Sequence, residues 1–274
     1  MTRGELIDKG TVKMTEAEYF TISDDRKAVT PENLAGLLEY PALYQAMKEN
    51  RDLRPALGEG QSTGRAFNDF VSLTPEEFAA KYVVAEGPVN PKTGKPYGTD
   101  TKAYLEWFNA QTRTPVTPAQ FNMFGLMAAA YAGHAFVKSL KHMKCLNNVV
   151  LGARFKDSVD LLFKVDKLYV GDDAVIAVDI KTTDDLCGFV NAAVRHKYTA
   201  QQALLMIILQ NAGVTDGQVR IAAVEKGPMP RCGIFETTEV LGTHKHAVEA
   251  ALADYAQSLT TGVFSTGFEA QALI

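Results

Sequence analysis

Residues 174–183 read Ala-Val-Ile-Ala-Val-Asp-Ile-Lys-Thr-Thr, an apolar run that ends with an acid and a base two positions apart. Side chains at positions i and i+2 of a β-strand point to the same face. We therefore expect Asp179 and Lys181 to lie side by side at the end of a central strand. Because an unpaired charge is costly to bury, the pair indicates one of two things. It is either an ion pair that closes the strand, or a metal ligand beside a residue that acts on water.

The pattern on either side of this stretch predicts a sheet that follows a helical segment. Strands are expected at 148–155, 161–169, 174–181, 218–225 and 233–240, with turn-type residues between the first three. Threonine-proline pairs at helix starts, together with apolar periodicity, predict helices. These are placed at 31–50, just after Gly64, and at 75–83, 118–143 and 189–211, with a last one after Thr243. The fold class is α+β (mixed α/β), a central mixed sheet flanked by helices.

The length fits one large domain or two small ones, and because no stretch has the composition of a linker we expect a single soluble domain over residues 1–274. Within it we expect a mainly helical part at 1–147, a sheet core with the site at 148–260, and a tail at 261–274. The net charge of −4 argues against a protein that coats nucleic acid by bulk charge, but it permits a local basic groove. Three cysteines without metal-site spacing, and no apolar signal or membrane-spanning run, predict a cytoplasmic protein.

A hairpin before the quoted stretch brings in a second acid. If residues 170–173 form its turn, Tyr169 faces Ala174, and Asp166 shares a face with Asp179 as a diagonal neighbour roughly 7–8 Å away. Two carboxylates at that separation can converge on one hard cation. Asp160 is the rival acid, but it lies roughly 20 Å from Asp166 along the strand and cannot reach the same ion.

Two acids and a lysine around a divalent cation suit phosphodiester hydrolysis. The cation polarises the phosphoryl oxygen and activates water, and Lys181 stabilises the negative charge that develops. The simple ion pair between Asp179 and Lys181 stays open as the alternative.

The segments Asp166-Lys167-Leu168 and Val178-Asp179-Ile180-Lys181-Thr182-Thr183 resemble the core of the PD-(D/E)xK nucleases. More closely, they resemble the exonuclease VIII (RecE-type) nuclease domain of phages and prophages. The resemblance extends over about residues 14–260. It includes Met14-Thr15-Glu16-Ala17-Glu18-Tyr19, Gly64-Arg65-Ala66-Phe67-Asn68, Leu73-Thr74-Pro75-Glu76-Glu77-Phe78, Tyr198-Thr199-Ala200-Gln201 and Val224-Glu225-Lys226.

The resemblance implies a magnesium-dependent exonuclease, with Mn²⁺ as a substitute, that degrades linear double-stranded DNA from 5′ ends. It also implies phage-type recombination beside a single-strand annealing protein, a ring-shaped homo-oligomer, and the cytoplasm of a bacterial host. Asp166 and Asp179 would bind the metal, completed by the Ile180 carbonyl and Asn68. Lys181 would assist the water, and Gln201 would orient the water or a phosphate.

Two positions depart from the family. Asn68 stands where the family usually has histidine, and an amide oxygen is a weaker ligand than imidazole. The neighbouring Asp69 could help, but it lies about 100° further round a helix. Leu205 stands where the family has an aromatic residue. These departures leave open a catalytically impaired DNA-binding or regulatory protein, and an endonuclease with the same core is a further alternative.

Three basic residues are candidates for DNA contact. Arg195 and Lys197 lie shortly before Gln201 in the sequence, and Lys141 belongs to a basic cluster near a helix end. Each has a plainer interpretation as a solvated residue, and cations near a helix C-terminus also complement the helix dipole.

Overall fold

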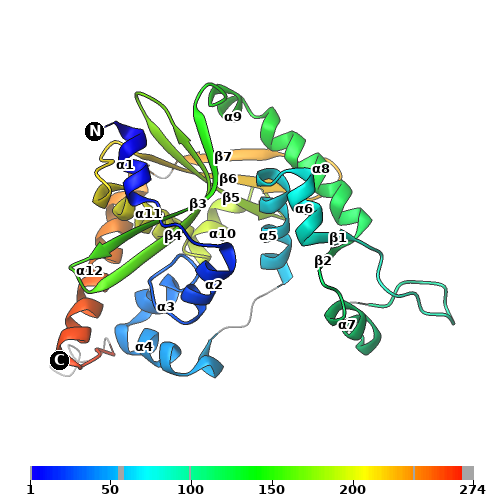
Figure 1. Ribbon diagram of the computed structural model, residues 1–274, viewed down its shortest axis with the longest axis horizontal. Helices are drawn as coiled ribbons and strands as arrows, with labels where there is room; N and C mark the ends of the chain where they lie inside the picture. The colour runs from blue at the N-terminus through cyan, green and yellow to red at the C-terminus, as the bar shows by residue number, and fades with distance from the viewer. Residues whose placement is uncertain (1, 55–58, 99, 237, 267–274) are drawn as a thin grey trace.

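The computed structural model describes residues 2–54, 59–98, 100–236 and 238–266 (Figure 1). Its centre is a five-stranded sheet in the order β3-β4-β5-β6-β7. The strands are β3 (Lys144–Phe155), β4 (Val159–Val170), β5 (Val175–Thr183), β6 (Gln218–Glu225) and β7 (Cys232–Glu236). β5 and β6 are parallel, and the other neighbours are antiparallel. This mixed sheet confirms the predicted fold class.

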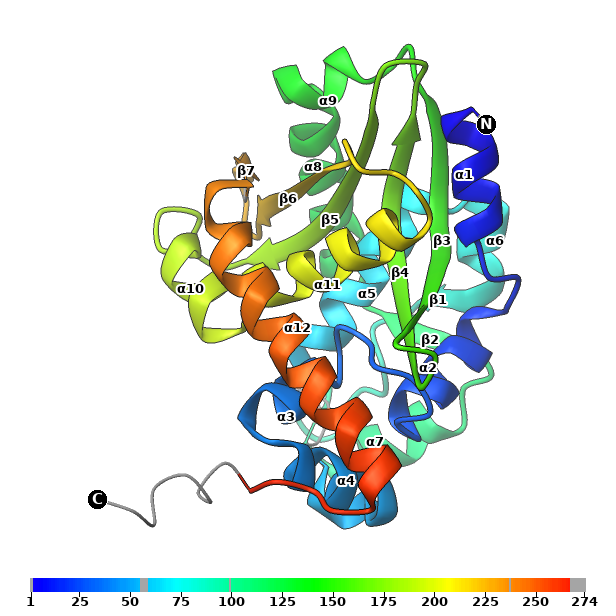
Figure 2. The same cartoon turned by 90° about the vertical axis from the view of Figure 1, so that its left-hand side faces the viewer.

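Helices cover both faces of the sheet (Figure 2). One face packs against α11 (Tyr198–Asn211) and α12 (Thr238–Thr261), and the other against α5 (Glu59–Ser72) and α8 (Pro118–Gly133). The central strands β4 and β5 are therefore buried on both sides, which explains their nearly continuous apolar sequences. The last three residues of β5, from Lys181 to Thr183, are half-buried. The strand thus leaves the core at the point where its charged residues lie.

The remaining elements surround this core. They are α1 (Arg3–Gly10), α2 (Glu16–Asp24), α3 (Leu34–Glu39), α4 (Pro41–Glu49), the 3-10 turn η1 (Arg51–Leu53), α6 (Pro75–Lys81), α7 (Lys102–Asn109), α9 (Ala135–Ser139), α10 (Phe189–Arg195), and the short parallel strands β1 (Tyr82–Val84) and β2 (Thr114–Val116). Among the described helices, none is long and apolar enough to cross a membrane.

Three predicted helices are broken in the structure. The helix expected at 31–50 divides into α3 and α4 because Pro41 keeps Tyr40 extended, with φ −172° and ψ 153°. The one expected at 118–143 divides into α8 and α9 at His134, which is also extended. The one expected at 189–211 divides into α10 and α11, because Lys197 adopts the left-handed conformation with φ 56°.

The predicted strand at 233–240 is too long, and the predicted last helix begins too late. β7 ends at Glu236, whose partner Arg220 lies near the start of β6, so the edge strand has little further backbone to pair with. α12 already begins at Thr238. Of the predicted tail at 261–274, residues 267–274 lie outside the described residues. The single-domain organisation stays a prediction.

A buried lysine fastens the C-terminal end of α5 to the sheet. Lys167 on β4 donates from its Nζ to the Val71 carbonyl at 2.6 Å and to Asn147 Oδ1 at 3.0 Å. Asn147 on β3 in turn donates to the Ser72 carbonyl at 3.1 Å. Two of the carbonyls that have no partner within the helix are satisfied in this way, and α5 is held across β3 and β4.

Candidate functional site

Asp166 lies on β4, next to the central strand β5, and is 7% exposed. Its Oδ2 accepts a hydrogen bond from the Ile180 backbone N–H at 2.8 Å and one from Asn68 Nδ2 at 3.2 Å. The same amide nitrogen also donates to the Ile180 carbonyl at 3.3 Å. A strand acid, a helix amide and a backbone carbonyl of β5 therefore meet at one point.

The hairpin that brings Asp166 to β5 has a different register from the predicted one. Val170 pairs with Val175 and Lys167 with Val178, so the turn lies one residue further along the chain than expected. The pairing is shifted by two residues. Because side chains alternate with a period of two, the shift leaves the predicted face of Asp166 unchanged. In the predicted register Asp166 is a diagonal neighbour of Asp179. In the observed register it lies next to Asp179, one residue beyond the last pair of the two strands, Lys167 and Val178.

Asp179 is held through both carboxylate oxygens. Lys181 Nζ lies 3.0 Å from Oδ1, and Gln202 Nε2 donates to Oδ2 at 2.6 Å. Asp179 is 5% exposed and Gln202 is fully buried. The Lys181 ammonium also lies 4.8 Å from the centre of the Tyr198 ring, which favours a cation in that position. The predicted neighbours Asp179 and Lys181 are thus in contact.

The electrostatics of the cluster favour an additional positive charge. Burial, followed by the charge of Asp179, raises the pKa of Asp166 to about 7, although Lys181 acts in the opposite direction. Burial alone would lower the pKa of Lys181, but Asp179 and Asp166 more than offset it and hold that pKa above its ordinary value. One lysine faces two buried carboxylates, so the negative charge of Asp166 and Asp179 is not fully compensated.

The residues around Asp166 fit a divalent cation. The Oδ1 atom of Asn68 is buried without a hydrogen-bond partner, while its Nδ2 lies between two oxygen acceptors. A half-turn of the amide would bring Oδ1 to the place where an oxygen ligand is needed, and the two orientations have nearly the same shape. Within the described ranges, no three or more His, Cys, Asp or Glu side chains form a group that could hold a metal. A cation here would therefore rest on two carboxylates and neutral oxygens, a ligand set that suits Mg²⁺.

The amide that contacts Asp179 belongs to Gln202, the neighbour of Gln201, for which the resemblance implies a role in orienting the water or a phosphate. Gln201 Nε2 instead donates to the Pro31 carbonyl at 3.2 Å. The sequence does hold a signal for Gln202, because Tyr198, Gln202 and Leu205 follow helical spacing and lie on one stripe of α11. A polar residue within that otherwise apolar stripe needs a buried partner.

The contact predicts different effects for the two glutamines. For the metal-dependent nuclease that the sequence predicts, we expect Gln202→Leu to lower the rate of nucleotide release about tenfold, because it removes a charge-assisted hydrogen bond to the Asp179 carboxylate. We expect Gln201→Leu to stay within about twofold of wild type. Rates of nucleotide release by the two variants at saturating Mg²⁺ measure the difference. The reverse order would support the catalytic role that the sequence predicts for Gln201.

Two other acids are placed away from the cluster. Asp69 on α5 accepts hydrogen bonds from Lys81 and from the Tyr82 hydroxyl, so its carboxylate is already engaged on another side of the helix. Asp160 lies at the far end of β4, where it is exposed and pairs with Arg154 at 3.1 Å. The structure thus places Asp160 and Asp69 away from the carboxylate cluster, and the role of Asp166 as a ligand stays a prediction.

The three predicted DNA contacts lie outside the carboxylate cluster. Arg195 is exposed at the C-terminal end of α10, and Lys141 is exposed after α9. Lys197 lies between α10 and α11, where its Nζ pairs with Glu39 at 2.8 Å. Lys197 therefore ties α11 to α3, while the side chains of Arg195 and Lys141 face solvent.

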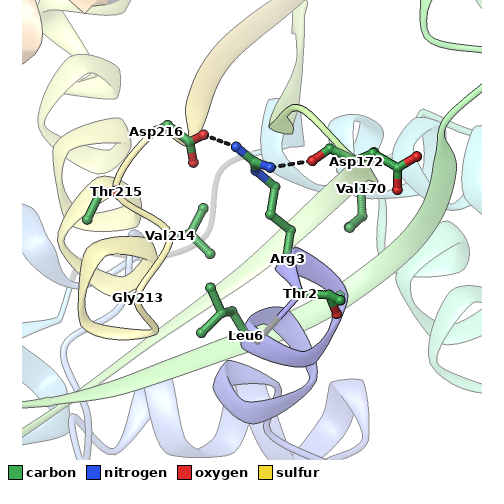
Figure 3. Close-up of a pocket in the computed structure, with 11 residues that line it drawn as sticks. Thr2, Arg3, Leu6, Val170, Asp172, Gly213, Val214, Thr215 and Asp216 are labelled. Atoms are coloured by element: carbon green, nitrogen blue, oxygen red, sulfur yellow. Dashed lines mark hydrogen bonds and ion pairs between the residues drawn. The ribbon is translucent and has the colours of Figure 1, made fainter.

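A cavity of about 680 Å³ lies elsewhere in the molecule (Figure 3). There Arg3 of α1 donates to the Asp216 carboxylate and to the Asp172 carbonyl (Figure 3). These contacts join the first helix to the β4–β5 turn and to the connection between α11 and β6. Because none of the predicted site residues lines this cavity, it carries no part of the carboxylate cluster.

Comparisons with known proteins support the fold. No family profile and no curated protein matches the chain by sequence. Among solved structures, the chain is similar to a protein from Eubacterium rectale that carries the provisional name of an exonuclease. The two share 13% sequence identity with a TM-score of 0.61, over 92% of this chain and 88% of the other. The arrangement of sheet and helices is therefore shared by the two proteins.

Proposed function

We propose that this protein is a metal-dependent exonuclease that hydrolyses phosphodiester bonds of linear double-stranded DNA, with 5′ to 3′ polarity. One observation carries the proposal. Asp166 and Asp179 are buried beside Lys181, and the Ile180 carbonyl and the unpartnered amide oxygen of Asn68 lie at the same point. The likeness to the protein from Eubacterium rectale and the resemblance to exonuclease VIII support the same reaction class.

The residues of this site would have two roles: some would bind the metal, and one would stabilise the phosphate. Asp166, Asp179, the Ile180 carbonyl and Asn68 would bind Mg²⁺, or Mn²⁺ as a substitute. The chemistry that the metal supplies at such a site is polarisation of the phosphoryl oxygen and activation of water. Lys181 would stabilise the charge that develops on the phosphate. Gln202 would keep Asp179 oriented through its 2.6 Å hydrogen bond.

A nuclease assay with matched substrates tests the proposal. With Mg²⁺, we expect wild-type protein to release nucleotides from a linear duplex and to leave a covalently closed circle intact. EDTA should stop the release. A label at the 5′ end should be released before a label at the 3′ end. Cleavage of the circle would indicate an endonuclease with the same core, and release from the 3′ label first would contradict the proposed polarity.

The position of Asn68 favours one second candidate, a DNA-binding or regulatory protein without turnover. Its Nδ2 bridges Asp166 and the Ile180 carbonyl at 3.2 and 3.3 Å, and in this orientation it occupies the place of a ligand. If the amide stays so oriented in the presence of Mg²⁺, the protein binds DNA without cleaving it. Binding of a labelled duplex with no release of nucleotides at any Mg²⁺ or Mn²⁺ concentration would support this candidate.

The resemblance to exonuclease VIII supports the remaining parts of the proposal. They are a role in phage-type recombination, a single-strand annealing protein as partner, a ring-shaped homo-oligomer, and the cytoplasm of a bacterial host. Co-purification with an annealing protein produced in the same cell tests the partner. Light scattering of the purified protein tests the homo-oligomer.

A further inference from the structure

We propose that Arg65, resting on the ring of Phe20, binds a phosphate of the DNA backbone beside the metal site. The proposal rests on the proposed function and adds to it a substrate contact that neither the sequence pattern nor the comparisons assign. Arg65 is half-buried on α5, and its guanidinium carbon lies 3.9 Å from the centre of the Phe20 ring on α2.

The charge of Arg65 is not neutralised by the acids around it. Glu16 pairs with Lys164 at 2.7 Å and also with Lys81. Asp69 pairs with Lys81 and accepts a hydrogen bond from the Tyr82 hydroxyl. In the described part of the chain, no carboxylate lies within ion-pair distance of the Arg65 guanidinium. The neighbouring carboxylates are thus already paired with lysines, and Arg65 keeps a net positive charge.

A second cation near Phe20 does not compete for this role. Lys164 Nζ lies 5.7 Å from the centre of the same ring, but its side chain is only 12% exposed and its ammonium is bound to Glu16. Arg65 is therefore the cation of this group whose charge is available to a ligand.

Arg65 lies next to the proposed metal site. It precedes Asn68 by three residues on α5, and side chains at that spacing are about 5–6 Å apart at their Cβ atoms. A Cβ placed on the preceding residue, Gly64, would be 3.5 Å from Thr182 Oγ1, so α5 passes the end of β5 at this residue. Because each strand of a duplex carries one phosphate per 3.4 Å of helix rise, a guanidinium here is within reach of a phosphate close to the one that is cleaved.

The contact with Phe20 orients the Arg65 guanidinium for binding of a phosphate. Stacking on an aromatic face fixes the plane of the arginine fork and leaves its N–H edges free. A fixed fork can donate two parallel hydrogen bonds to one phosphate, which is the geometry that makes arginine a strong phosphate ligand. Less side-chain freedom is lost on binding than for an arginine that is free in solvent.

The test measures binding of a short fluorescein-labelled blunt duplex in EDTA, where no turnover occurs, between about 50 and about 200 mM salt. We expect Arg65→Met to weaken binding about tenfold. It should also reduce the slope of log K against log salt by about 0.9, the value for one phosphate contact. Arg65→Lys should keep most of the slope. Phe20→Leu should weaken binding while it leaves the slope unchanged, because the charge remains.

Arg154→Met is the matched control, because Arg154 is an exposed arginine that pairs with Asp160 far along β4. Its slope and affinity should equal those of wild type. If Arg65→Met binds within twofold of wild type with the same slope, the proposed contact is wrong while the nuclease proposal stands. If wild type itself neither binds nor cleaves the duplex, both proposals are wrong.

Discussion

Replacement of Asp179 by asparagine is expected to abolish nucleotide release, with a loss of at least about a thousandfold in rate. Asp179 contributes a buried carboxylate to the proposed metal site and is the partner of Lys181 at 3.0 Å. Loss of a metal-ligand charge removes several kcal/mol of transition-state stabilisation, and each 1.4 kcal/mol corresponds to about a tenfold change in rate. The measurement is release of nucleotides from a linear duplex at saturating Mg²⁺.

The control for this experiment is an aspartate on the neighbouring strand β4. Asp160→Asn changes an exposed aspartate of β4 whose partner is Arg154, and it should retain the wild-type rate. Circular dichroism would verify that both variants are folded. If Asp179→Asn cleaves within about threefold of wild type, the carboxylate cluster is not the catalytic centre. The plainer interpretation of Asp179 and Lys181 as a structural ion pair would then hold.

Replacement of Asp166 by asparagine is expected to have two opposite effects. It should remove Mg²⁺ binding, and it should make the metal-free protein more stable at alkaline pH. The second effect follows because burial and the charge of Asp179 raise the pKa of Asp166 to about 7. The folded protein therefore binds this proton more tightly than the unfolded chain, in which an aspartate has a pKa of about 3.9. Above about pH 7 Asp166 is ionised in both states, and its buried charge lowers the free energy of unfolding by at most about 4 kcal/mol.

The sign of the pH dependence gives a sharp measurement. At about pH 4 and below, both states hold the proton, so Asp166→Asn and wild type should have similar melting temperatures. As the pH rises from about 4 to about 7, the unfolded chain loses this proton while the folded protein keeps it, so the melting temperature of wild type in EDTA should fall and then level off above about pH 7. The variant should then melt roughly 5–10 °C higher than wild type. Mg²⁺ should raise the melting temperature of wild type alone, because only wild type keeps both carboxylates.

A variant that melts at or below the wild-type temperature at pH 8 would contradict the raised pKa. A variant that is still stabilised by Mg²⁺ would contradict the role of Asp166 as a ligand. The two results are independent, since the first concerns the metal-free protein.

The relative placement of Asp166 and Asp179 could be predicted from the sequence, because an even shift in strand pairing leaves each side chain on the same face of the sheet. The predicted hairpin turn was misplaced by one residue, which shifts the pairing by two, and an even shift keeps Asp166 on its face. Asp160 could be set aside from strand length alone. These conclusions depend on spacing along an extended chain, which the sequence determines directly.

The helix contributions were harder to predict, because a one-residue error turns a helical side chain by about 100°. Gln201 donates to the Pro31 carbonyl and its neighbour Gln202 donates to Asp179, and the role expected for Gln201 stays a prediction. The contact between Arg65 and Phe20 joins two helices that are separate in the sequence. The left-handed Lys197 that divides α10 from α11 also depends on packing, since its Nζ reaches Glu39 of α3.

The anchorage of α5 by Lys167 has a mechanical consequence. The helix is fastened at Val71, where Lys167 Nζ donates at 2.6 Å. With a rise of about 1.5 Å per residue, Asn68 lies about 4.5 Å from that fastening and Arg65 about 9 Å. If α5 tilts about its anchored end, each residue moves in proportion to its distance from that end. Arg65 is then displaced about twice as far as Asn68. Asn68, the proposed metal ligand, thus lies closer to the anchored end of α5 than Arg65, the proposed phosphate contact.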